Sequence, residues 1–252
     1  MMFLRIASLL CGLLLLSSSV FAYGRSDVIA TVEAPFKSDA TAAIHDFTAD
    51  FFQQSRIASL DKIQRGQGEV KIRFASNSRV NRAPLAMFRW EYSAPTEQEI
   101  VSDGHTMWVY LPENSQVIES DLSVVDSARA DDPATFLTGL GNLSRDFSIH
   151  FAIPDVDVEG NPVLELKPRR SSPLITRLLL VVDRRAVQDH TSGRPPEYFP
   201  ILSSTVFDPN GNSTIIEFND GRINRGLSSL DFRFMMPPGV DVVRPTGSGL
   251  GF

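Results

Sequence analysis

Short segments in which apolar and polar residues alternate recur along the chain from Phe47 onward, and they constrain the fold more than any other feature. In one of them, Phe88, Trp90 and Tyr92 share one face while the residues between them are charged. This period is typical of a half-buried strand, because successive side chains of a strand point to opposite faces of the sheet. Many such segments joined by short turns predict an antiparallel sheet that curls or closes.

About eleven strands can be placed in this way. They cover residues 47–52, 70–74, 88–92, 98–102, 106–111, 147–151, 163–167, 175–182, 201–207, 213–219 and 230–234. The pair Asp103-Gly104 favours a tight hairpin turn between two of them. Residues 189–200 contain Gly193 and three prolines, which indicates an exposed loop.

Two segments are better suited to helices. Residues 26–44 favour a helix that Pro35 should break or kink, because proline lacks the backbone donor that a helix needs. In residues 132–140, Asp132 can cap a helix and Pro133 suits its first position, and apolar residues follow at helical spacing. The pattern as a whole predicts an all-β barrel or half-barrel with helices packed on it or in it.

No internal repeat, linker or change of composition divides the chain. We therefore expect one domain over residues 23–252. Residues 244–252, which are rich in glycine, should form a disordered tail.

The first 22 residues have the three parts of a signal peptide. Arg5 is their only charge, an apolar run follows over Ile6–Leu16, and Val20-Phe21-Ala22 forms a cleavage site. The apolar run is shorter than the 20 residues or so that a membrane-spanning helix needs. We expect cleavage before Tyr23 and an exported, periplasmic protein.

Cleavage would remove Cys11, the only cysteine, so the mature chain would have no disulfide and no thiol nucleophile. Leu10 precedes Cys11 where lipidation signals need a small residue, which argues against acylation. The formal charge of the whole chain is −6, and the loss of Arg5 makes it −7. A mildly acidic protein without a basic stripe is a poor candidate for binding nucleic acid.

The sequence lacks the usual signatures of an enzyme. Its four histidines, His45, His105, His150 and His190, form no H-x-x-x-H pair, and there is no G-x-S-x-G elbow. His105 lies near Asp103, but the Asp-Gly turn explains that aspartate. We expect no catalytic residues, no metal and no cofactor.

Aromatic residues are concentrated between Phe88 and Tyr110, where both tryptophans and two of the four tyrosines occur. They could fill the core, or they could line the ligand cavity that small barrels often enclose. Periodicity alone does not distinguish these alternatives.

At these same residues the sequence resembles the LolA family, and the resemblance extends over nearly all of residues 23–252. The matching motifs are Arg82-Ala83-Pro84, Phe88-Arg89-Trp90-Glu91-Tyr92, Ile100–Gly104, Met107–Tyr110 with Pro112, Asp132–Leu137, Asp208–Asn212, Phe218, Asn224, Phe232-Arg233-Phe234 and Pro238–Val240. Their order and spacing together are more specific than any one of them.

The resemblance implies an incomplete, half-open antiparallel β-barrel with a helical lid over a hydrophobic cavity. It also implies a monomeric periplasmic carrier of acylated lipoproteins. The carrier would load at an inner-membrane ABC transporter of the LolCDE type and unload at an outer-membrane receptor of the LolB type. Such a carrier is needed because each methylene of an acyl chain exposed to water costs about 0.8 kcal/mol.

The resemblance further implies which residues form the site. The lipid cavity would be lined by Phe51, Phe88, Trp90, Trp108, Tyr110, Phe136 and Leu137. An arginine would latch the lid by donating hydrogen bonds to carbonyls of residues 132–140. Arg82 is the best match for it and Arg79 the alternative, because Ala83 separates Arg82 from the proline that directly follows the family's arginine.

Two other functions stay open. A periplasmic regulator could use the same barrel to sense lipids or lipoproteins, although such regulators usually carry a second domain. An exported hydrolase would show turnover that depends on His105 or Asp103.

Overall fold

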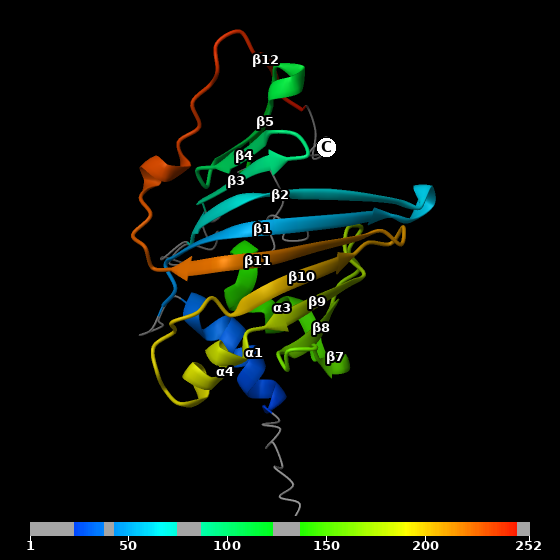
Figure 1. Ribbon diagram of the computed structural model, residues 1–252, viewed down its shortest axis with the longest axis vertical. Helices are drawn as coiled ribbons and strands as arrows, with labels where there is room; N and C mark the ends of the chain where they lie inside the picture. Colours follow the sequence, from blue (N-terminus) through cyan, green and yellow to red (C-terminus); the bar gives the residue numbers. More distant parts are fainter. Residues whose placement is uncertain (1–22, 38–42, 75–86, 123–136, 246–252) are drawn as a thin grey trace, which may run out of the picture.

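The computed structural model describes residues 23–37, 43–74, 87–122 and 137–245, and a twelve-stranded β-sheet forms its centre (Figure 1). The strands are β1 (Asp46–Ile57), β2 (Lys62–Arg73), β3 (Met87–Ala94), β4 (Gln98–Ser102), β5 (Thr106–Leu111), β6 (Gln116–Asp121), β7 (Phe147–Val156), β8 (Pro162–Pro168), β9 (Arg177–Val182), β10 (Ile201–Phe207), β11 (Ser213–Ile223) and β12 (Asp241–Val243).

The strand order is β12-β6-β5-β4-β3-β2-β1-β11-β10-β9-β8-β7. Neighbouring strands are antiparallel, apart from the parallel pair of β12 and β6. The sheet is open, with β12 and β7 at its two edges. The predicted class, a mostly β and incompletely closed antiparallel fold, is therefore confirmed.

The helical elements are short. They are α1 (Arg25–Glu33), α3 (Leu143–Asp146) and α4 (Arg184–Thr191), with the 3₁₀ turns η1 (Ala34–Phe36), η2 (Ala58–Leu60), η3 (Pro112–Asn114), η5 (Leu137–Asn142) and η6 (Ser229–Phe232). In the part of the chain that the structure describes, no helix is long and apolar enough to cross a membrane.

Strands with clear local signals lie where the sequence predicts them. β4, β5 and β10 coincide with predicted segments 98–102, 106–111 and 201–207. Alternation does not indicate β6, because its apolar residues Val117 and Ile118 are adjacent. The helix predicted from residue 26 is present as α1, and it gives way to the turn η1 at Pro35 as expected.

The prediction of an exposed loop at 189–200 is wrong at both ends. The helix α4 extends to Thr191, and Asp183 caps it by accepting a hydrogen bond from the Arg185 backbone N–H at 2.8 Å. At the other end of the segment, Phe199 is only 5% exposed and belongs to the core. Between these two ends, residues 190–198 are exposed or half-buried, as the prolines and the glycine predict.

The sheet has an inner face, which packs against the helices, and an outer face. Along β1, Phe47, Ala49 and Phe51 are buried on the inner face, and Asp50 between them is exposed. The helices α1, α3 and α4 lie together on one side of the strands (Figure 1). Apolar side chains from both layers form one core.

A strand predicted at 230–234 is absent, and a segment that we call the strap (residues 225–240) occupies this part of the chain. The strap begins at Asp46, whose carboxylate accepts the backbone N–H groups of residues 225–227 at 2.6–3.1 Å. Ser228 then caps η6. Its amide and hydroxyl donate to Asp231 and hold the pKa of that carboxyl below its usual range.

The strap is fixed to the outer face through Arg89 on β3. The Arg89 guanidinium donates to the carbonyl oxygens of Asp231 at 2.9 Å and Arg233 at 2.8 Å. The carbonyls of these two residues are therefore bound to a side chain. The backbone of residues 231–233 does not pair with a neighbouring strand. Beyond the strap, β12 pairs with β6, and Arg244 forms an ion pair with Glu119 at 2.7 Å. Arg244, which the sequence placed in the expected tail, is therefore held against β6, and residues 246–252 lie outside the described residues.

Replacing Arg89 with leucine should loosen the strap. The two carbonyls would lose a charged donor, so we expect a loss of about 1–3 kcal/mol in the free energy of unfolding. Backbone amides of η6 should also exchange with deuterium faster than in the wild type. Arg177→Leu is the control, because Arg177 forms an ion pair with Glu165 at 3.5 Å across β8 and β9, at the other end of the sheet. Equal exchange of η6 in both variants would contradict this role of Arg89.

Candidate functional site

The inner face of the sheet carries a row of aromatic side chains that neighbouring strands bring together. The register places Phe51 of β1 opposite Gly68 of β2, which in turn lies opposite Tyr92 of β3. Phe51, Phe88 and Trp90 are each at most 2% exposed. The rings of Phe51 and Trp90 meet edge to face with centroids 4.9 Å apart. Three of the residues predicted for the lipid site thus lie on one apolar surface.

A second aromatic group continues this surface toward the helices. Phe199 stacks on Phe47 with centroids 3.8 Å apart, and Phe218 meets Phe47 edge to face at 5.5 Å. Phe36 of η1 lies 6.1 Å from Phe199. Alternation around Phe47 and Phe218 could have identified those two, whereas no local pattern indicates Phe199.

The helices cover this surface with apolar side chains. Those fully buried against it include Val28, Val32, Leu137, Leu140, Leu143 and Val187. Leu137, predicted as a residue of the lid, is 1% exposed and lies in η5. Acyl chains could therefore reach the aromatic surface only if this cover moved.

Toward the hairpin of β1 and β2, the inner face becomes polar. The Tyr92 hydroxyl donates to Gln53 at 2.8 Å, and the Gln53 amide donates to Ser55 at 3.2 Å. Ser55 and Thr214 share a hydrogen bond of 3.1 Å. The surface thus has an apolar part and a polar margin, which suits an amphiphile.

The sequence predicts that four aromatic residues of β3 and β5 line one cavity. In the structure, Trp108 and Tyr110 do not share a face with Phe88 and Trp90. Trp108 lies opposite Val101, and Tyr110 opposite Glu99, in register with the outer side chains of β3. Trp108 stacks on Phe234 of the strap with centroids 5.6 Å apart and donates to Glu119 at 3.2 Å. Both residues therefore belong to the outer face.

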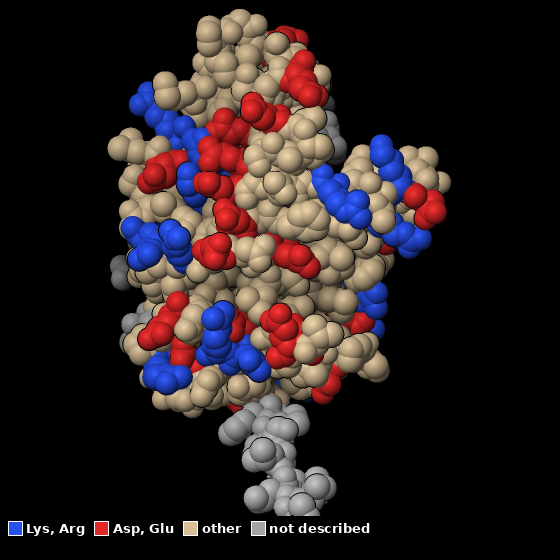
Figure 2. Space-filling model, viewed as in Figure 1, with Lys and Arg blue, Asp and Glu red and all other residues tan. Residues whose placement is uncertain are grey.

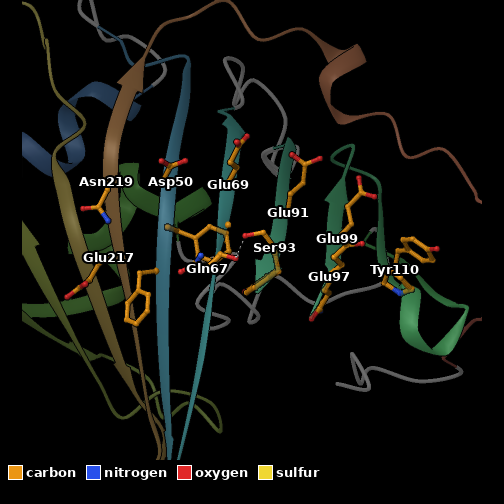
Figure 3. A pocket seen from close by; sticks show the side chains of 16 residues that line it. Asp50, Gln67, Glu69, Glu91, Ser93, Glu97, Glu99, Tyr110, Glu217 and Asn219 are labelled. Atoms are coloured by element: carbon orange, nitrogen blue, oxygen red, sulfur yellow. Dashed lines mark hydrogen bonds between the residues drawn. The ribbon is translucent and has the colours of Figure 1, made fainter. Parts of the chain in front are cut away.

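The outer face contains a groove of about 890 Å³ with acidic walls. One cross-strand row consists of Asn219, Asp50, Glu69, Glu91, Glu99 and Tyr110. Figure 3 shows these side chains on neighbouring strands, and Figure 2 shows the acidic side chains as a column over the sheet. Arg89 forms ion pairs with Glu91 and Glu99 and offsets part of their repulsion. Carboxylate walls do not favour an apolar ligand, because the charged groups would have to be desolvated.

Several predicted features lie outside the described residues. They are the signal peptide at 1–22, the latch candidates Arg79 and Arg82, the start of the lid at Asp132, and Phe136.

Comparison with known proteins identifies relatives over most of the chain. Residues 42–192 match the family model described as "Outer membrane lipoprotein carrier protein LolA". An outer-membrane lipoprotein carrier protein of Pseudomonas paraeruginosa is 28% identical over 200 residues, covering 78% of this chain and 80% of that protein. The protein of the same description from Methylobacillus flagellatus is 25% identical and covers 96% of this chain and 99% of its own length.

Among solved structures, the LolA superfamily protein NE2245 from Nitrosomonas europaea matches 84% of this chain and 99% of its own. The two are 16% identical, and the TM-score is 0.38.

Proposed function

The chain belongs to the LolA family, and on this premise we propose that it is a periplasmic carrier that shelters the acyl chains of lipoproteins on the inner face of its sheet. The observation that supports this most is the apolar, aromatic inner face, which is covered by helices and continues into a polar margin. Acyl chains would occupy the apolar part, and the head of the lipoprotein would lie toward the margin.

Two contacts join the helices and turns of the cover to one another. The Glu33 carboxylate at the end of α1 accepts a hydrogen bond from the Ser144 backbone N–H, which ties α1 to α3. Gly141 of η5 lies so close to Phe36 that a Cβ atom there would be 2.9 Å from the Phe36 carbonyl oxygen. The contact with the sheet is largely apolar, and apolar contacts are non-directional. When the cover opens, the inner face of the sheet would thus lose its contacts with the cover and gain contacts with acyl chains.

The partners follow from this role. Acylated lipoproteins would be received from an inner-membrane ABC transporter of the LolCDE type and passed to an outer-membrane receptor of the LolB type. The task is binding and release, and it includes no chemical step, so we propose no enzymatic activity. The signal peptide at residues 1–22 would direct export to the periplasm.

Replacing Phe88 with glutamate should weaken carriage strongly. A carboxylate on the inner face must be desolvated when acyl chains cover it, so binding of an acylated lipoprotein should weaken at least about ten-fold. The measurement is co-elution of the carrier with a purified diacylated lipoprotein in size-exclusion chromatography without detergent, after circular dichroism has shown that the variant is folded.

Tyr110→Glu is the matched control, because Tyr110 is an aromatic residue on the outer face. This variant should carry lipoprotein like the wild type. Loss of co-elution in Tyr110→Glu alone would place the lipid site on the outer face, and failure of the wild type to bind any acylated protein would refute the carrier role.

A further inference from the structure

The indole N–H of Trp90 is a buried hydrogen-bond donor with no acceptor among the described residues. The side chain is 1% exposed. Its neighbours on the inner face are aromatic, with Phe51 at 4.9 Å and Phe218 at 6.3 Å between ring centroids. A buried donor without an acceptor destabilises a fold, and such groups are rare.

Trp90 differs in this respect from the other tryptophan. Trp108, on the outer face, donates its indole N–H to Glu119 at 3.2 Å. Two further buried polar atoms lack partners among the described residues, Ser120 Oγ and Asp189 Oδ2. The Asp189 carboxylate has Arg194 on its other oxygen, at 2.6 Å, and a serine hydroxyl can rotate. The indole N–H can only donate, and its direction is set by the ring.

The position of Trp90 indicates the kind of acceptor that is missing. The Phe51 ring contacts both Trp90 and Tyr92, with centroids 4.9 Å and 4.8 Å away. Tyr92 begins the polar margin through its bond to Gln53. Trp90 therefore lies where the apolar surface approaches the margin. In an amphiphile with its chains on the apolar surface, the groups at that level are the carbonyls that link the chains to the head.

We propose that the Trp90 indole N–H donates a hydrogen bond to an ester carbonyl of the bound acyl chains, so that this carrier selects ester-linked chains over ether-linked ones. This inference rests on the proposed carrier function and adds a specificity-determining residue to it. Ester carbonyls accept a hydrogen bond well and carry no charge, so they suit a donor in an apolar setting. An ether oxygen is a weaker acceptor.

The direct test follows the two indole N–H signals of ¹⁵N-labelled protein by NMR. The probes are a synthetic lipopeptide with two palmitoyl esters on an S-glyceryl-cysteine and its analogue with two ether-linked chains of the same length. Trp108→Phe assigns the signals. The Trp90 signal should move downfield when the ester probe binds and less when the ether probe binds, while the Trp108 signal should stay in place.

Binding affinities give an independent test. The wild type should bind the ester probe about three- to ten-fold more tightly than the ether probe, the worth of one net hydrogen bond. In Trp90→Phe this preference should disappear, even if the smaller ring weakens the binding of both probes. Trp108→Phe should keep the wild-type preference.

The outcomes separate the two proposals. If the wild type binds neither probe, the carrier function fails. If it binds both probes equally, or if Trp90→Phe keeps the preference for the ester, the carrier function stands and the role of the Trp90 N–H is refuted.

Discussion

Alanine in place of Phe199 is expected to lower the free energy of unfolding by about 3–5 kcal/mol, the usual loss for a buried phenylalanine. Phe199 is 5% exposed and stacks on Phe47 with centroids 3.8 Å apart. Its ring also lies near Phe36 and Phe218, so it joins the turn η1 to the sheet. Since domains of this kind are stable by about 5–15 kcal/mol, the variant would lose a large part of its stability. Urea unfolding followed by circular dichroism measures the change.

The neighbouring tyrosine is the matched control. Tyr198 is half-buried, and the Arg185 guanidinium lies 4.1 Å from the centroid of its ring. Tyr198→Ala should therefore destabilise by no more than about 1 kcal/mol, the usual worth of a cation–π contact at an exposed site. Similar losses in the two variants would show that Phe199 does not support the core.

Alanine in place of Gly68 should be comparably severe. A Cβ atom at this position would overlap the Glu91 carbonyl oxygen and lie 2.9 Å from the Tyr92 Cα atom. Both are backbone atoms of β3, at a point where the register of β2 and β3 shifts. They cannot rotate away, so the strands must separate. We expect a loss of about 3 kcal/mol in the free energy of unfolding, the upper end of what overpacking usually causes.

Gly66→Ala tests whether the effect is specific to this contact. Gly66 lies two residues away in β2, and a Cβ atom there would first meet the Tyr92 ring at 3.2 Å. Because a side chain can shift, stability should stay within about 1 kcal/mol of the wild type. If Gly68→Ala unfolds at the same urea concentration as Gly66→Ala, the close approach of β2 and β3 is not a constraint.

Local sequence signals predicted the parts of the fold whose cause is local. β4 and β5 have their predicted bounds because an Asp-Gly turn separates them, in which Asp103 accepts backbone N–H groups of His105 and Thr106. Pro35 ended α1 for an equally local reason, since proline cannot donate to the preceding turn. The strand predicted at 230–234 failed because Arg89 binds the carbonyls there, and Arg89 lies some 140 positions earlier in the chain.

In the candidate site, too, local sequence patterns did not predict contacts between residues that are distant in the chain. Alternation indicated that Phe88 and Trp90 share one face and that Trp108 and Tyr110 share another face of a nearby strand. It could not indicate that these are opposite faces of the sheet. The register of three strands decides that, together with the strap that gives Trp108 an aromatic partner in Phe234.

By itself, the sequence therefore determined the β-rich class, several strand bounds and membership in a carrier family. Alternation, turn residues and motifs each depend only on residues that are close together in the chain. The tertiary structure alone decided which aromatic residues face the helices, that Phe199 is buried, and that the Trp90 N–H has no acceptor among the described residues. Burial and hydrogen bonding depend on what packs against a face, and here the packing partners are distant in the chain.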